Sequence, residues 1–280
     1  MKVTIVAIFD KHEDFIELQY NSIIKHVKGD YEYVVYNNAK TPEQTAANKE
    51  CCDRLGVKCV RIISGTGGPS DIAALGLANA FGNHVDEPVF KIDSDMFFIS
   101  DVNLCSILSD NDLFYIPVIT NTIMWSGVFG INRQRVKDAL DFSPSPGDTF
   151  CKSDVLVANP DYTRKTFELL NLQKVDEDGT VTTNYNGDSL VIFGDDDEIT
   201  FTTEAHYGED GFYDGIVARY RAILPLLDSY DFPKPYNVDF IAMDGVAFLI
   251  HFKSSNWCPW YTEKYVTDKK IAMTKMLGDL

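Results

Sequence analysis

Two carboxylates separated by one residue lie in an otherwise apolar run, residues 90–98. Asp93 and Asp95 flank Ser94, and Lys91 precedes them. On a strand, side chains at positions i and i+2 point to the same face, where two negative charges repel unless a cation lies beside them. Burying an unpaired carboxylate is costly, so the pair predicts a site at which Mg²⁺ or Mn²⁺ completes its oxygen shell with substrate phosphates. Alternatively, the two residues end a strand and cap the following turn.

A further candidate ligand follows a second apolar run. His251 ends the run of residues 246–251. A neutral imidazole binds Mn²⁺ and other transition ions, and a neighbouring hydrogen-bond acceptor fixes its tautomer. The alternative is a histidine at the end of a strand that hydrogen-bonds a backbone carbonyl.

Two other segments offer chemistry that suits a sugar or an acceptor hydroxyl. Glu209 and Asp210 precede a segment of helical periodicity, where a carboxylate stays ionised. The pair either activates a hydroxyl as a general base or only caps the helix. The Trp125 indole suits the apolar side of a sugar ring, and Gly127 allows a close approach, although core packing would explain Trp125 equally well.

Alternating strand-like and helix-like segments position these residues in the first half of the chain. The pattern predicts an α/β fold with a mixed, mostly parallel central sheet flanked by helices. Thr41 and Pro42 predict a helix start, and Gly56 predicts its end. Open α/β sheets bind ligands beyond the carboxyl ends of their strands, which is where the acidic pair would lie. The expected strands are residues 3–9, 32–36, 57–63 and 89–99, and the expected helices are near 15–27, 41–55 and 71–81.

The second half of the sequence is less regular. We expect strands at 113–119, 128–131 and 246–250, helices at 213–227 and 262–277, and loops at 143–147 and 176–187. No internal repeat or linker marks a boundary. The sequence therefore predicts one catalytic domain over residues 1–280.

Composition excludes several classes of partner. The chain has 25 Lys and Arg against 42 Asp and Glu, a net charge of −17, which repels nucleic acids and anionic lipid surfaces. No apolar run has the length of a signal peptide or a transmembrane helix. The six cysteines form no CxxC motif, which indicates reduced thiols. These features predict a cytoplasmic protein that binds any anionic substrate locally, through a divalent cation.

The ordered motifs of the first 100 residues resemble nucleotide-sugar glycosyltransferases of the GT-A fold, in which a DxD motif holds a metal against the donor diphosphate. The matching parts are residues 3–9 and 34–39, the Ala-rich segment before the acidic run, and Asp93-Ser94-Asp95. The resemblance implies that Asp95 is the direct metal ligand and that His251 completes the metal shell. It implies a donor site formed by Ile8, Phe9, Asp10, Asn37, Asn38, Asp71, Asn79, Lys91 and Ser94.

Two later motifs extend the resemblance. Residues 251–260 resemble the His-Phe-x-Gly-x-x-Lys-Pro-Trp ending of some retaining members, with Ser254 at the glycine position and no lysine at the phosphate-binding position. Lys253 and the donors up to Asn256 and Trp257 would then bind the donor. Glu209-Asp210 resembles the Glu-Asp motif of inverting members, which makes Asp210 the acceptor base with Glu209 in support. The segment with Trp125 and Gly127 would face the acceptor.

Together, these features predict a metal-dependent hexosyl- or pentosyltransferase. It would use Mn²⁺ or Mg²⁺ and transfer a sugar from a nucleoside diphosphate, UDP being favoured, to a hydroxyl acceptor such as a glycan, with inversion favoured. Residues 1–100 would bind the donor and 101–280 the acceptor. Two alternatives stay open, a sugar nucleotidyltransferase and a non-catalytic nucleotide-sugar-binding protein. A dinucleotide-binding oxidoreductase fits less well, because Ser70 stands where the third glycine of GxGxxG would be.

Overall fold

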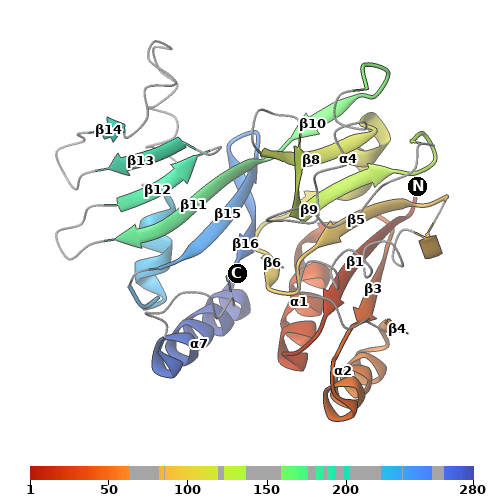
Figure 1. Ribbon diagram of the computed structural model, residues 1–280, viewed down its shortest axis with the longest axis horizontal. Coiled ribbons are helices and arrows are strands. Elements are labelled where there is room, and N and C mark those ends of the chain that lie inside the picture. The colour runs from red at the N-terminus through yellow and green to blue at the C-terminus, as the bar shows by residue number, and fades with distance from the viewer. Residues whose placement is uncertain are drawn as a thin grey trace. The chain divides into compact units, whose positions relative to one another are not determined.

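The computed structural model divides into two compact units, Met1–Phe167 and Glu168–Leu280 (Figure 1). The single catalytic domain expected over the whole chain stays a prediction. The expected helix at 71–81 and the expected loop at 143–147 lie outside the described residues. The structure describes residues 1–62, 82–84, 86–118, 123–136, 159–175, 181–185, 188–192, 199–201, 222–234, 236–253 and 262–280.

A seven-stranded sheet forms the centre of the first unit, in the order β10-β8-β9-β5-β1-β3-β4. Its pairs are parallel except β8 with β9 and β9 with β5. The predicted mixed, mostly parallel sheet is therefore confirmed. The strands are β1 (Val3–Phe9), β3 (Tyr31–Asn37), β4 (Lys58–Arg61), β5 (Pro88–Ile92), β8 (Leu113–Val118), β9 (Ile123–Asn132) and β10 (Arg164–Thr166).

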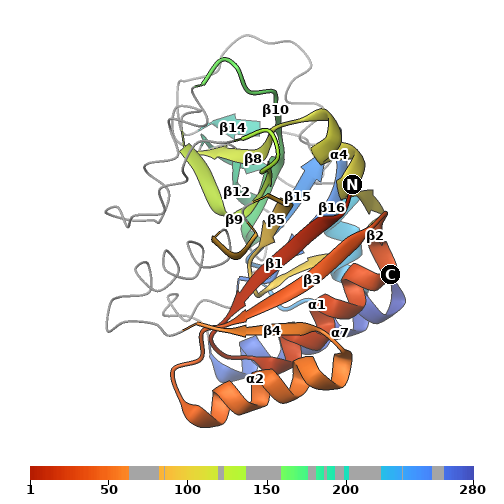
Figure 2. The ribbon, with the colours of Figure 1, turned by 90° about the vertical axis from the view of Figure 1, so that its right-hand side faces the viewer.

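Helices α1 (Glu13–His26) and α2 (Pro42–Leu55) lie side by side on one face of this sheet (Figure 2). The ends of α2 are those predicted from its capping residues. The Thr41 hydroxyl accepts a hydrogen bond from the Gln44 amide at 3.2 Å, and Gly56 ends the helix with a φ of 69°. A short parallel pair, β2 (Val27–Lys28) with β7 (Val102–Asn103), leads into α4 (Leu104–Asp110).

The predicted strand over residues 89–99 is interrupted by the acidic pair. The structure contains β5 and then a separate strand, β6 (Met96–Phe98), with Asp93 to Asp95 in the turn between them. The Met96 amide donates to the Asp93 carbonyl at 3.2 Å, which closes the turn. The inference that both carboxylates share one face of a strand is therefore wrong, because a hydrogen-bonded turn rather than a strand carries them.

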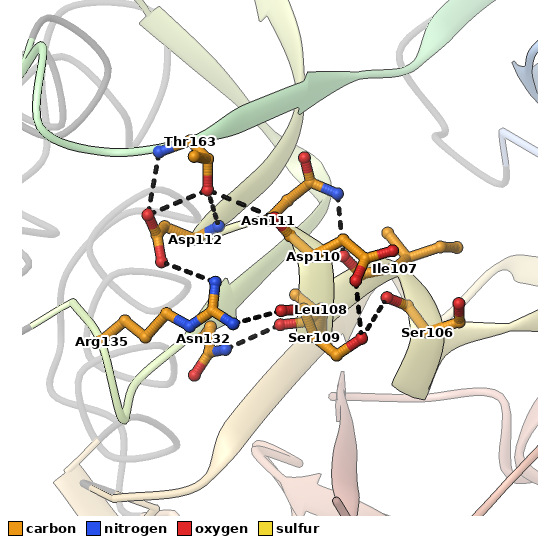
Figure 3. Close-up of polar contacts among 10 residues, drawn as sticks. All are labelled: Ser106, Ile107, Leu108, Ser109, Asp110, Asn111, Asp112, Asn132, Arg135 and Thr163. Atoms are coloured by element: carbon orange, nitrogen blue, oxygen red, sulfur yellow. Dashed lines mark hydrogen bonds and ion pairs between the residues drawn. The ribbon is translucent and has the colours of Figure 1, made fainter.

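A polar network joins the end of α4 to β9 and to the segment before β10 (Figure 3). The buried Asp112 carboxylate accepts hydrogen bonds from the Thr163 amide at 2.9 Å and the Thr163 hydroxyl at 3.0 Å, and it forms an ion pair with Arg135. The Asn132 side chain donates to the Leu108 carbonyl at 2.7 Å. The Asn132 bond provides a partner for a carbonyl group that the end of α4 leaves unpaired.

We expect Asp112→Ala to lower the free energy of unfolding by about 2 kcal/mol, because it leaves the Thr163 amide without its acceptor and removes the carboxylate that pairs with Arg135. Asp110→Ala is the matched control, since Asp110 is an exposed residue of the same segment, and it should change stability by less than about 0.5 kcal/mol. Urea unfolding measures both. Equal losses would contradict a structural role for the Asp112 network.

The second unit contains an antiparallel sheet in the order β14-β13-β12-β11-β15-β16. Its strands are β11 (Glu168–Val175), β12 (Val181–Tyr185), β13 (Asp188–Ile192), β14 (Ile199–Phe201), β15 (Val238–Met243) and β16 (Val246–His251). The loop expected at 176–187 is corrected in part, because β12 lies within it. The helix described at residues 222–229 extends beyond the predicted end at 227.

The C-terminal helix of the second unit is α7 (Glu263–Asp279), and it confirms the helix predicted for this segment. The Thr262 hydroxyl accepts a hydrogen bond from the Tyr265 amide at 3.1 Å and so defines its start. Among the described residues, no helix combines the length and the apolar character needed to cross a membrane.

Candidate functional site

The acidic turn lies at the carboxyl edge of the parallel strands. β1 runs parallel to both β5 and β3, and Phe9 pairs with Asn37 at the ends of their strands. The turn with Asp93 and Asp95 therefore shares an edge with the segments after β1 and β3. Open α/β sheets commonly bind ligands at this edge, and a donor site here stays a prediction.

Asp95 and Asp93 differ in their surroundings. Asp95 is 7% exposed, whereas the Asp93 side chain is partly open to solvent. Carboxylate oxygens of the two residues lie within 4.8 Å of each other. At this separation, two like charges in a partly buried site repel strongly, so a cation beside them stabilises the charged forms.

Lys91 provides one such cation. It is 3% exposed, and its ammonium forms an ion pair with Asp93 Oδ1 and donates to the Gly127 carbonyl at 3.3 Å. Burial of a lysine requires such partners. Lys91 was expected to bind the donor, and in the structure its ammonium forms an ion pair with the Asp93 carboxylate.

The two asparagines after β3 have different environments. The Asn37 amide donates to the Thr45 carbonyl at 2.9 Å, and its oxygen accepts from the Ala39 amide at 3.2 Å and from Asn48 at 3.3 Å. Asn37 therefore holds its own loop. The Asn38 Oδ1 atom is buried and has no hydrogen-bond partner in the described part of the chain. Of the two residues, Asn38 has the acceptor that a ligand could use.

A thiol pair lies beside Asn37. A hydrogen bond from the Cys52 thiol is the largest cause of a Cys59 pKa lowered to about 7; burial opposes it, and Asn37 and the Lys49 ammonium add smaller lowering effects. The same hydrogen bond, together with burial, raises the pKa of Cys52. The partly exposed Cys59 is therefore the more nucleophilic thiol of the pair.

We expect iodoacetamide to alkylate Cys59 before the other partly exposed cysteine of the described chain, Cys105, at pH 7. Because the thiolate is the reactive form, the rate at Cys59 should fall as the pH drops below 7. Peptide mapping by mass spectrometry over time measures both rates. Cys52→Ala should move the midpoint for Cys59 to higher pH, and an unchanged midpoint would contradict the role of Cys52.

Trp125 and Gly127 lie close together on β9. A Cβ atom added to Gly127 would stand 2.5 Å from Trp125 Cζ2 and 2.8 Å from Met96 Cε. Glycine is therefore required here because the Trp125 indole occupies the space above it. The expectation that these residues face an acceptor sugar stays a prediction.

In the second unit, His251 belongs to a buried polar cluster. Asp239 on β15 is the register partner of His251 on β16, and it is 2% exposed. Its Oδ2 atom lies 3.1 Å from His251 Nδ1, and its Oδ1 atom lies 2.8 Å from the Lys253 ammonium. Contact with a carboxylate favours a proton on Nδ1, which makes Nε2 the nitrogen that would bind a metal.

Sequence reasoning missed Asp239, although a carboxylate between Val238 and Phe240 in an apolar strand is a usable signal. Its partner could not be read from spacing, because the register of the β15–β16 hairpin pairs it with His251. The other expected site residues, which are Asp71, Asn79, Glu209, Asp210, Asn256 and Trp257, lie outside the described residues.

The first unit thus has a mostly parallel sheet with an acidic turn at the carboxyl edge of its parallel strands. The sequence matches no protein-family model and no curated protein.

Similar solved structures include the mannosyltransferase PcManGT from Pyrobaculum calidifontis, in complex with GDP-Man and Mn²⁺. It is 15% identical, with a TM-score of 0.46, and the match covers 59% of this chain and 54% of that one. TarS from S. aureus is 21% identical over 42% of this chain and 22% of that one, with a TM-score of 0.31. The bifunctional glycosyltransferase WbbM is 15% identical over 48% and 32%, with a TM-score of 0.32. The chain thus spans about half of PcManGT and less of the others.

Proposed function

We propose that this protein is a metal-dependent glycosyltransferase that transfers a sugar from a nucleoside diphosphate, UDP being favoured, to a hydroxyl acceptor such as a glycan. One observation carries the proposal. A buried carboxylate, Asp95, lies in a turn at the carboxyl edge of parallel strands, within 4.8 Å of a second carboxylate on Asp93. This is a geometry in which a divalent cation and a diphosphate can share a site.

The donor set fits Mn²⁺ or Mg²⁺. The carboxylates of Asp93 and Asp95 are oxygen ligands that both ions accept, and we assign His251 as a further ligand from the sequence motifs, because an imidazole suits Mn²⁺ in particular. The Lys91 ammonium occupies Asp93 Oδ1, which supports Asp95 as the direct ligand. The contact between Asp239 and His251 Nδ1 supports the metal-binding role of the histidine. When bound, the metal would stabilise charge on the leaving diphosphate.

The donor would lie along the sheet edge. We assign the base and ribose to Ile8, Phe9, Asp10 and Asn38, with support from the buried Asn38 Oδ1 atom, for which the described part of the chain offers no hydrogen-bond partner. The net charge of −17 opposes the approach of any anion, so the diphosphate must be held by local positive charge. In this proposal Lys253 contributes part of that charge. Ser94, Asp71, Asn79, Asn256 and Trp257 complete the proposed donor-binding residues.

The chemical step needs a base at the acceptor. We assign this role to Asp210, supported by Glu209, with Trp125 and Gly127 facing the acceptor. Asp210 would remove the proton of the acceptor hydroxyl while its oxygen attacks the anomeric carbon, and the bond to the diphosphate breaks. Attack from the face opposite the leaving group gives inversion, the outcome we favour.

A thermal-shift screen of nucleotide sugars, each with and without Mn²⁺, tests the proposal. A donor that binds only the folded state raises the unfolding midpoint, and we expect the increase to require Mn²⁺. The donor with the largest shift is then incubated with glycan acceptors, and NMR assigns the anomeric configuration of the product. A shift without any transfer product would favour the non-catalytic binding protein. Release of pyrophosphate from sugar 1-phosphate and a nucleoside triphosphate would favour the nucleotidyltransferase.

A further inference from the structure

We propose that Gln19 is a positioning residue that sets the shape of the acidic turn through its backbone carbonyls, and that Tyr33 holds Gln19 in place. The inference about metal affinity rests on the proposed function, whereas the inference about the turn rests on the contacts alone. Gln19 lies on α1, 74 residues from Asp93 in the sequence. It therefore links an early helix to the turn that carries the candidate metal ligands.

One side-chain amide contacts both ends of the turn. Gln19 is fully buried, and its Nε2 atom donates to the Asp93 carbonyl at 2.8 Å and to the Met96 carbonyl at 2.7 Å. An amide nitrogen has two hydrogens, so both are used on this turn. Because the two hydrogens are fixed in one plane, the two carbonyls are held at a fixed separation.

The carbonyls that Gln19 binds lie on either side of Asp95 along the chain. The Asp93 carbonyl also accepts from the Met96 amide, so the turn is closed both by its own backbone and by the Gln19 side chain. The direction of a side chain follows from the backbone that carries it. Fixing the backbone on both sides of Asp95 therefore fixes where its carboxylate points without any contact to the carboxylate itself. A neutral amide does this without adding a charge that would compete with a metal.

Tyr33 orients the Gln19 amide. Its hydroxyl, which comes from β3, donates to Gln19 Oε1 at 2.7 Å. Burial raises the pKa of the Tyr33 phenol, so the hydroxyl remains a donor. With Oε1 bound to the Tyr33 hydroxyl, Nε2 points toward the turn. The flipped amide would place the Nε2 donor against the Tyr33 hydroxyl donor, which is unfavourable.

The test compares Gln19→Met, Tyr33→Phe and a matched control, Ser22→Ala. Methionine is similar in length but has no donor, and phenylalanine lacks only the hydroxyl. The buried Ser22 hydroxyl donates to the Gln19 carbonyl at 2.8 Å and accepts from the Phe98 amide at 3.1 Å, so its loss also removes two buried hydrogen bonds of α1. Unlike Gln19, the Ser22 hydroxyl bonds the Gln19 carbonyl and the Phe98 amide rather than the Asp93 and Met96 carbonyls.

Two readouts are needed. Electron paramagnetic resonance of free Mn²⁺ measures metal affinity, and we expect Gln19→Met to raise the dissociation constant roughly 10- to 100-fold, Tyr33→Phe less, and Ser22→Ala not at all. Hydrogen exchange measures opening of the turn at the Asp95 and Met96 amides without any metal. We expect faster exchange there in the Gln19 and Tyr33 variants only, while Ser22→Ala lowers the unfolding midpoint.

The outcomes separate the two proposals. If the native protein binds no Mn²⁺, the metal-dependent function fails, and hydrogen exchange alone decides the role of Gln19. If the native protein binds Mn²⁺ but the Gln19 and Tyr33 variants match Ser22→Ala in both readouts, Gln19 is only part of the packing and the inference is wrong. Should Gln19→Met fail to fold, Tyr33→Phe gives the decision, because it keeps the amide and the aromatic ring.

Discussion

Replacing Asp95 by asparagine is expected to weaken Mn²⁺ binding and to lower Mn²⁺-dependent sugar transfer by roughly three orders of magnitude, equivalent to about 4 kcal/mol. The substitution keeps the size and shape of a buried side chain. It removes the charge that the proposal assigns to the metal. It also relieves the repulsion between two carboxylates that lie within 4.8 Å of each other.

Asp101→Asn is the matched control for Asp95→Asn. Both variants change the net charge by the same amount, and the Asp101 side chain is 65% exposed. A loss of metal affinity through the overall field of the protein would therefore occur in both. Isothermal titration with Mn²⁺ and the thermal shift with Mn²⁺ and UDP measure the effect. If Asp95→Asn binds Mn²⁺ as well as Asp101→Asn does, the proposed metal site is wrong. If Asp95→Asn binds the donor normally but transfers no sugar, Asp95 acts in the chemical step and not in donor binding.

Elements with local determinants could be predicted from the sequence. Both ends of helix α2 are set by capping residues, Thr41 at the start and Gly56 at the end. Each acts through the nearest backbone groups, so the signal is local in the sequence. β1 is buried on both faces and reads as a continuous apolar run, which is typical of a central parallel strand. The alternation of strands and helices also predicted that the acidic pair lies at the carboxyl edge of the sheet.

Features that depend on distant contacts could not be predicted. The apolar residues Met96 to Phe98 continue the pattern of β5, so residues 89–99 read as one strand. The break at the acidic turn involves Gln19, and no local pattern reveals a contact across 74 residues. Strand β12 was read as loop because its polar residues and the nearby glycines favour turns, whereas cross-strand pairing with β11 and β13 determines its structure.

Asp239→Ala is expected to lower the free energy of unfolding by about 3 kcal/mol, because breaking a buried ion pair leaves an uncompensated charge. Asp239 is almost completely buried and contacts both His251 and Lys253, so its loss leaves the Lys253 ammonium without this partner. The His251 ring also loses the acceptor that orients it. If His251 binds metal as proposed, the dissociation constant for Mn²⁺ should rise roughly 10- to 100-fold.

Asp268→Ala provides the control for Asp239→Ala within the second unit. Asp268 pairs with Lys264 one turn away on α7, and both side chains are exposed, so its removal should cost less than about 0.5 kcal/mol. Asp239→Asn keeps an oxygen for His251 and should retain more metal affinity than the alanine variant. Urea unfolding and Mn²⁺ titration separate the effect on stability from the effect on the metal.

A second substitution isolates the cause of the instability expected for Asp239→Ala. In that background, Lys253→Met removes the ammonium that lost its carboxylate, and we expect it to recover part of the lost stability. In the native background the same Lys253→Met change should destabilise, since it leaves the buried Asp239 carboxylate without its cation. Such a change of sign identifies an electrostatic coupling. Simple addition of the two losses would instead assign the effect of Asp239 to packing and would overturn the ion-pair account.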